Sequence, residues 1–138
     1  MSDRSPEKAT IALTAEQGRH YALGDKLSAR FLADEVETGA RYSISEWRLE
    51  PGQEGVGAHS HAENDDIFYV LEGRIEFLLG ESWTEFGPGA FVRAPAGVTH
   101  DFRNRGAAPA RLLNIYIPGG FERDMQGIVA WFAAQKSK

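Results

Sequence analysis

The 138-residue sequence contains no cysteine, and this absence removes several kinds of chemistry. Without cysteine the chain forms no disulfide and offers no thiolate, so any metal site must use His, Asp or Glu. The N-terminus also lacks the apolar segment of a secretory signal, and together the two absences predict a cytoplasmic protein. No apolar run approaches the roughly 20 residues of a membrane-spanning helix, so no membrane association is expected.

Positive charge is scarce as well. The 15 Lys and Arg residues are outnumbered by 20 Asp and Glu, which gives a formal net charge of -5. A nucleic-acid-binding domain usually carries a basic stripe, whereas the basic residues here are scattered among acids, so no nucleic-acid partner is expected. Hydrophobic residues at 42% and charged residues at 25% are typical of a soluble globular chain, and this length predicts one core.

The chain shows no internal repeat and no dividing linker. Residues 1–10 are polar and predict a flexible N-terminal tail, while residues 11–138 predict a single domain. Within that domain, short strand-like segments alternate with turns rich in Gly, Pro and Asn, which predicts a sandwich or barrel over about 26–118. The expected strands are Lys26–Ala33, Arg41–Leu49, Asp66–Leu71, Arg74–Leu79, Ser82–Phe86, Ala90–Arg93, Val98–Arg103 and Ala110–Ile117.

The C-terminal region has a different pattern, which predicts a helix over about 120–135. Apolar residues recur there at steps of three and four, as on one face of an amphipathic helix. The residues in this stripe are Phe121, Met125, Ile128, Val129 and Phe132. We expect the stripe to pack on the barrel wall.

Two of the four histidines, His59 and His61, are separated by one residue in the segment HSHAENDDIFYVLEG. Residues two apart in an extended chain point to the same side, so these imidazoles are placed to chelate one ion. Asp66 begins the next apolar run, where it shares a face with Phe68 and Val70. Its carboxylate is therefore expected to point into the same interior as the imidazoles.

A third histidine, His100, follows the tight turn Pro95-Ala96-Gly97. Three neutral imidazoles and a carboxylate suit one divalent transition metal ion, and Fe, Mn, Ni, Co, Cu and Zn all remain open. Each part of this group also has an ordinary alternative role. His59 and His61 would be a solvated or pH-sensitive pair in a loop, and His100 a hydrogen-bonded core histidine. Burying all four side chains together without a metal would leave several polar groups unpaired, which favours the metal site.

These residues lie in two segments that resemble the signature motifs of the cupins, a family of small β-barrels. The first family motif reads Gly, five or six residues, His-x-His, three or four residues, Glu, six residues, Gly; its counterparts here are Gly52, His59, His61, Asp66 and Gly73. The second reads Gly, five residues, Pro-x-Gly, two residues, His, three residues, Asn; it is complete in Gly89, Pro95, Gly97, His100 and Asn104. The resemblance implies an all-β fold, a cupin barrel of the double-stranded β-helix or jelly-roll type, here followed by a C-terminal α-helix.

Three further stretches, DDIFYVLEG, PAGVTHDFRN and PGGFE, resemble single-domain bacterial cupins related to quercetin 2,3-dioxygenases. That resemblance implies a metal held by His59, His61, Asp66 and His100, with Asp66 as the catalytic group that takes a proton from the substrate hydroxyl. Asp66 is one methylene shorter than the family's Glu. It either reaches the ion after a slight strand shift or leaves a wider site with an extra water, and Glu63 and Asp65 are nearby alternatives.

Strand parity also nominates residues for a substrate pocket. Phe68 lies two residues from Asp66, and Phe102 lies two from His100, so both rings are expected to face the interior near the ion. Trp47 and Tyr116 are further candidates. Plain core packing is the alternative for each of the four rings.

The sequence leaves three functions open. The leading hypothesis is a metal-dependent dioxygenase acting on a small aromatic or flavonoid-like substrate. The second is a non-redox isomerase or lyase for a small polar acid, which would need basic residues such as Arg48, Arg93 or Arg111 beside the metal. The third is a cupin that binds a small ligand without turnover. A homodimer formed through a strand edge around Lys26–Ala33 is also expected.

Overall fold

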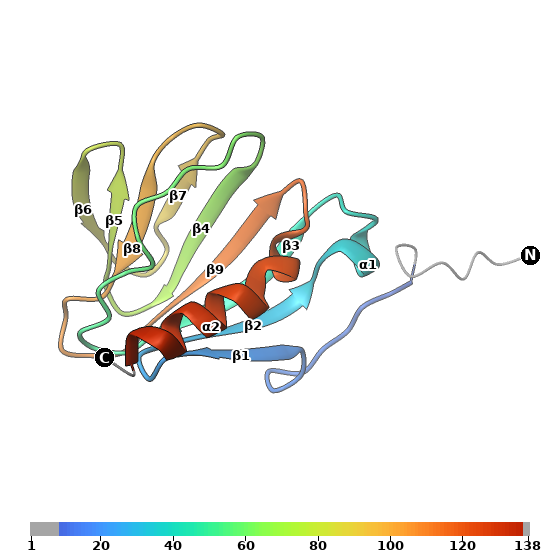
Figure 1. Cartoon of the computed structure of the whole chain (residues 1–138), viewed down its shortest axis with the longest axis horizontal. Coiled ribbons are helices and arrows are strands. Elements are labelled where there is room, and N and C mark those ends of the chain that lie inside the picture. The colour runs from blue at the N-terminus through green and yellow to red at the C-terminus, as the bar shows by residue number, and fades with distance from the viewer. Residues whose placement is uncertain (1–8, 137–138) are drawn as a thin grey trace, which may run out of the picture.

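The structure, a computed structural model, describes residues 9–136 and is mostly β-sheet (Figure 1). Residues 1–8, most of the expected flexible tail, lie outside the described residues. The elements in chain order are β1 (Arg19–Leu23), β2 (Leu27–Ala33), α1 (Glu35–Thr38), β3 (Ser43–Leu49), β4 (Asp65–Glu72), β5 (Ile75–Leu79), β6 (Ser82–Phe86), β7 (Phe91–Ala94), β8 (His100–Arg103), β9 (Ala110–Ile117), the 3-10 turn η2 (Phe121–Asp124) and α2 (Met125–Lys136).

The strands form two sheets whose apolar faces meet. The larger sheet has the order β1-β2-β3-β9-β4-β7 and the smaller the order β6-β5-β8. Phe68 of the larger sheet contacts two rings of the smaller one, Phe77 at a centroid distance of 5.2 Å and Phe102 at 5.8 Å. Burial of each such side chain contributes about 1.5–3 kcal/mol, so this shared layer holds the sheets together.

The closed barrel expected from the sequence is not formed. Among residues 9–136, no strand ladder joins the two sheets. The connection is made instead by the long loop between β3 and β4, which adds isolated bridges along β8 and the turn after it, at His59↔His100 and Gln53↔Asn104. The small sheet is therefore extended by a loop, and this loop carries two of the candidate ligands.

Strands β2 to β9 correspond to the eight expected strands, with small shifts at their ends. The sequence analysis missed β1, because its sequence RHYAL buries only its last residue and lacks a period-two apolar pattern. β1 pairs with β2 along its length, so the expected free edge at Lys26–Ala33 is covered. The free edges of the larger sheet are β1 and β7.

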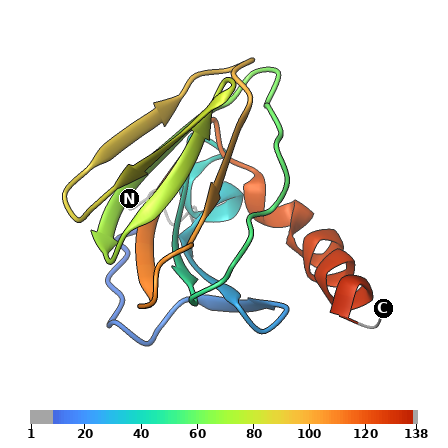
Figure 2. The same cartoon turned by 90° about the vertical axis from the view of Figure 1, so that its left-hand side faces the viewer.

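The C-terminal segment begins with one 3-10 turn before the α-helix expected there. The buried Asp34 carboxylate accepts the backbone N–H groups of Gly120 and Glu122, both at 2.6 Å, and so fixes where η2 starts. Met125 is fully buried, and Ile128, Val129 and Phe132 pack against the core. Figure 2 shows α2 to one side of the two sheets. No helix within residues 9–136 is both long and apolar enough to cross a membrane.

Candidate metal centre

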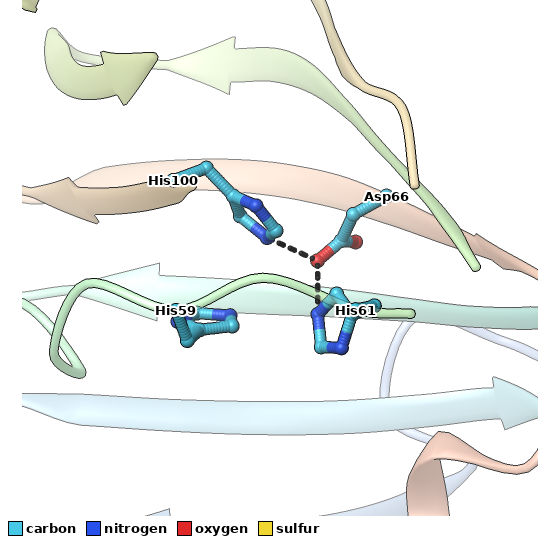
Figure 3. Close-up of side chains that lie close together, drawn as sticks. All are labelled: His59, His61, Asp66 and His100. Carbon is cyan, nitrogen blue, oxygen red and sulfur yellow. Dashed lines mark hydrogen bonds and ion pairs between the residues drawn. The ribbon is translucent and has the colours of Figure 1, made fainter. Parts of the chain in front are cut away.

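The four candidate ligands come from three segments that the fold brings together. His59 and His61 lie in the β3–β4 loop, Asp66 lies in β4, and His100 begins β8. One ligand atom from each residue can be chosen so that all four lie within 4.8 Å of one another, and Figure 3 shows the side chains converging. The expected juxtaposition is therefore present, although the segment from His59 to His61 is a loop with one bridge and not a regular strand.

Each imidazole has its Nδ1 atom engaged away from the centre. His59 Nδ1 is 2.7 Å from the Gly57 carbonyl oxygen, and His100 Nδ1 is 2.9 Å from that of Val98. A carbonyl only accepts, so both Nδ1 atoms carry a proton, and in the neutral rings the Nε2 lone pairs are free for an ion. His61 Nδ1 is 3.3 Å from the Tyr116 hydroxyl, which plays the same orienting role.

The Asp66 carboxylate is shared between the imidazoles and a buried amide. Its Oδ2 atom is 3.0 Å from His100 Nε2 and 3.4 Å from His61 Nε2. Its Oδ1 atom accepts a 2.5 Å hydrogen bond from Asn114 Nδ2, which also donates to the Ile67 carbonyl. Asn114 therefore orients Asp66 so that the other oxygen faces the histidines.

Asn114 was not among the residues predicted from the sequence, although a signal was present. In the β9 sequence ARLLNIYI, Asn114 has the same parity as Leu112, and both face the interior. A polar side chain at an inward position of a core strand must find a partner, which points to a buried polar site nearby.

Electrostatics in the cluster favour an ionised Asp66. Burial alone would raise the pKa of this carboxyl, but the hydrogen bonds from His100 and Asn114 and the nearby His61 ring outweigh it and lower the pKa below its usual value. Burial alone would lower the pKa of His100, yet the hydrogen bond to Asp66 raises it. Burial lowers the pKa of His59. These shifts therefore favour an Asp66–His100 ion pair beside an uncharged His59.

The donor set fits a transition metal ion. The buried Nε2 atom of His61 has no hydrogen-bond partner within the described residues, despite lying near Asp66. A buried ring nitrogen without a partner is costly, and coordination to a cation would satisfy it. Three imidazoles and one carboxylate are ligands that Fe, Mn, Co, Ni, Cu and Zn all accept.

Backbone contacts hold the two histidine segments in place. The buried Asp101 carboxylate accepts the backbone N–H groups of Val56 and Gly57, which positions the loop before His59. Gly97 adopts a φ of 87°, a conformation that favours glycine, and its N–H donates to the His61 carbonyl at 2.8 Å. The turn before His100 is thereby tied to the His-x-His segment.

The alternative acids are engaged elsewhere or lie outside the cluster. Asp65 forms an ion pair with Arg93 at 3.0 Å and accepts the backbone N–H of Ala96, so it stabilises the turn before β8. Glu63 is exposed and is not part of the four-residue group. Asp66 is the carboxylate that the structure places among the imidazoles.

A cavity of about 400 Å³ opens from the ligand cluster. Three of the four predicted pocket rings, Trp47, Phe68 and Phe102, line it together with His59, His61 and Asp66. Tyr116 does not line the cavity, and instead packs its ring against His61 and Phe121. The sequence analysis missed the part of the wall that η2 and α2 contribute: Phe121, Asp124, Ile128, Trp131 and Phe132.

Comparison with protein families gives a match to the cupin domain over residues 45–116, just over half of the chain. The chain belongs to the cupin family. All four candidate ligands lie inside the matched segment. A comparison with curated proteins finds no significant match.

Solved structures support the cupin fold. A protein from Thermus thermophilus, TT1209, is 30% identical, with 67% of this chain and 84% of that chain covered and a TM-score of 0.60. The polyketide cyclase RemF from Streptomyces resistomycificus is 24% identical over 85% of this chain and 79% of that one, with a TM-score of 0.59. A predicted oxalate decarboxylase from Thermotoga maritima is 16% identical over 80% and 99%, with a TM-score of 0.69. These similarities do not distinguish quercetin dioxygenases from other cupins.

Proposed function

We propose that this cupin is a metal-dependent dioxygenase for a small hydroxylated aromatic substrate. One observation carries the proposal: four ligand atoms lie within 4.8 Å of one another, and three of their residues, His59, His61 and Asp66, line a cavity whose other walls are largely aromatic and apolar. A cavity with apolar walls and a few convergent polar groups is typical of a small-molecule site. Its volume of about 400 Å³ is sufficient for a compact ring system.

Each residue of the cluster has a distinct role in this proposal. His59, His61, His100 and Asp66 would hold a divalent ion, which when bound supplies a Lewis acid and a template for the substrate oxygen and O2. One carboxylate among three neutral imidazoles leaves a divalent site with a net positive charge, which favours an ionised phenolic oxygen. Asp66 is kept ionised by its hydrogen bonds, so its carboxylate can accept the proton of the substrate hydroxyl.

The cavity walls support an aromatic substrate. Phe68 and Phe102 are buried beside the ligand cluster, and Trp47 contacts Phe102 edge to face at a centroid distance of 6.1 Å. Such walls exclude water and favour planar, apolar groups through edge and face contacts. They offer few hydrogen bonds, which makes a sugar a poor occupant.

A non-redox reaction on an aromatic or polyketide-like substrate is the second candidate, because the same apolar walls suit it and the structural neighbour RemF is a polyketide cyclase. An isomerase or lyase for a small polar acid has less support. Arg48, Arg93 and Arg111 form ion pairs with acids and do not line the cavity. Within residues 9–135, no Lys or Arg lines it.

The test is metal analysis of the purified protein followed by O2 consumption with catechols and flavonols. Tightly bound Fe, Mn, Co, Ni or Cu with uptake that depends on the substrate would support the dioxygenase. Zinc without O2 uptake would favour the non-redox reaction. A protein that takes up no metal under metal-replete conditions would leave only a binding role.

A further inference from the structure

The ionisable residues that line the cavity are histidines and aspartates. They are His59, His61 and Asp66 at the ligand cluster, and the exposed Asp124 among the residues that η2 and α2 contribute. No Lys or Arg side chain compensates Asp124 there, and within residues 9–135 its carboxylate forms no ion pair or side-chain hydrogen bond. The part of the wall formed by η2 and α2 is therefore apolar except for the exposed, unpaired carboxylate of Asp124.

Asp124 is held in this position by the turn that carries it. The buried Asp34 carboxylate binds two backbone N–H groups at the start of η2. Glu122 accepts hydrogen bonds from Arg19 and from the Tyr21 hydroxyl, both at 2.7 Å, which ties η2 to β1. Met125, the next residue after Asp124, is fully buried. These contacts on both sides fix the backbone at Asp124 relative to the cavity.

One ring connects the ligand cluster with the turn that carries Asp124. Tyr116 lies between the ligand cluster and η2. Tyr116 packs against His61 at a centroid distance of 4.9 Å and against Phe121 of η2 at 5.1 Å. Asp124 belongs to the same turn as Phe121 and lines the same cavity of about 400 Å³ as three of the ligands, so one small molecule can contact both.

An acid in the first turn of a helix can also interact favourably with the helix N-terminus, and Asp124 immediately precedes α2. That interaction alone does not require the side chain to line a cavity. If Asp124 served only the helix, replacing it would leave ligand selectivity unchanged. A substitution therefore distinguishes a role in the helix from a role in ligand selection.

We propose that the cavity selects substrates by the charge of the group farthest from the metal, and that Asp124 is the residue that determines this selectivity. Ring-bearing molecules with a neutral or cationic far end are accepted, and those with a carboxylate there are rejected. A carboxylate at that end would meet apolar rings and a like charge with no basic partner, whereas an ammonium would pair with Asp124. This inference rests on the proposed function, because it assumes that the hydroxylated end of the ring faces the ligand cluster.

The experiment compares three probes that share a catechol ring and differ at the far end: ethylcatechol, dopamine and dihydroxyphenylacetate. Binding to the metal-loaded protein is measured by calorimetry near neutral pH. We expect dopamine to bind at least tenfold more tightly than dihydroxyphenylacetate, with ethylcatechol between them. Equal dissociation constants, or a preference for the carboxylate, would overturn the inference.

Variants assign the effect to Asp124. In Asp124→Asn the ratio between dopamine and dihydroxyphenylacetate should shrink severalfold, and in Asp124→Lys the order should reverse. Glu81→Lys is the matched control, since it makes the same charge change in the exposed β5–β6 turn outside the cavity and should keep the wild-type order. An unchanged order in Asp124→Lys would show that Asp124 does not set the selectivity.

Failure of the proposed function would look different. If the three probes bind in the expected order but none supports O2 consumption, the charge selection stands and the dioxygenase proposal falls. If O2 is consumed equally with all three probes at equal affinity, the dioxygenase stands and the charge selection falls. If none of them binds, both fall.

Discussion

His59 and His100 lie directly opposite each other in an antiparallel bridge, and each donates its backbone N–H to the carbonyl of the other, at 3.0 and 2.7 Å. Their rings are 4.4 Å apart between centroids. Two candidate ligands from distant parts of the chain are thus brought together by main-chain hydrogen bonds. Their imidazoles can be removed without removing the contacts that align the two segments.

The first prediction concerns His100. His100→Ala should lower the bound metal content sharply while the circular dichroism spectrum stays unchanged, because the backbone bridge to His59 does not need the imidazole. His20→Ala is the control: His20 is the remaining histidine, is exposed, and should be dispensable for metal binding. Unchanged metal content in His100→Ala would remove this residue from the site.

The second prediction concerns Asn114, whose amide orients Asp66. Asn114→Ala should weaken metal binding by about 10–100-fold, the usual effect of losing a group that orients a ligand. It should also cost about 1–3 kcal/mol in the free energy of unfolding, because a buried carboxylate oxygen loses its partner. Metal titration and urea denaturation measure the two effects.

The matched control for Asn114 is Asn64→Ala. Asn64 is an amide that donates to the Pro118 carbonyl and lies outside the ligand cluster. Its loss should leave metal affinity within about twofold of wild type. Equal effects of the two substitutions would mean that Asn114 stabilises the fold and does not act on Asp66.

The third prediction concerns the length of the Asp66 side chain. Asp66→Glu restores the residue typical of the family, but the extra methylene moves the carboxylate away from the Asn114 amide. We expect this variant to bind metal, and we expect Asn114→Ala to have much less effect in this background than in the wild type. A double-mutant cycle on metal affinity measures the coupling, and strictly additive effects would contradict it.

The fourth prediction concerns the proton that His100 releases when metal binds. His100 Nδ1 faces a carbonyl and Nε2 faces the Asp66 carboxylate, so both ring nitrogens donate and the metal-free ring is charged. Its pKa is raised above 6.5, so at a pH between 6.5 and the raised value metal must displace a proton, and apparent affinity should rise with pH until His100 deprotonates. His59, whose pKa is lowered, is already neutral there. Calorimetry in buffers of different ionisation enthalpy should show close to one proton released by this ring; no buffer dependence would contradict the assignment.

The same shifts predict the pH dependence of stability without metal. The contribution of His100, with its pKa raised from 6.5, is fully present below that value and is lost as pH rises through the folded-state pKa. The contribution of Asp66, with its pKa lowered from 3.8, is present above that value and is lost as pH falls through the folded-state pKa. His59 affects stability in the opposite direction to His100. Because its pKa is lowered, its contribution to stability increases as the pH rises to 6.5. In His100→Ala the loss of stability on raising the pH through the folded-state pKa of His100 should disappear, which urea denaturation at several pH values would detect.

Local patterns in the sequence were sufficient to predict the ligand cluster and most of the strands. The period-two alternation of β4 placed Asp66 and Phe68 on one face, and the structure buries both. The two histidine motifs likewise predicted which segments meet. Each of these features depends on residues close together in the chain or on a motif that specifies the partner segment.

The remaining features depend on contacts that no local pattern records. β1 is an edge strand with little apolar periodicity, so its pairing with β2 was not visible. The open arrangement of the sheets depends on which edges pair, and strand parity does not specify this. The position of Asp124 depends on Asp34 anchoring η2 from a distant part of the chain. Tyr116 is buried, but its ring packs against His61 and Phe121 and does not line the cavity.

The cavity joins two parts of the chain that can vary separately. The four ligands lie between His59 and His100, whereas Ile128, Trp131 and Phe132 belong to α2. Trp131 keeps 52% of its surface exposed, so it is not fixed by core packing and tolerates replacement. Substitutions in the final helix can therefore alter which molecules are admitted while the ion keeps its ligands, and a cupin of this shape could acquire new substrates without rebuilding its reactive centre.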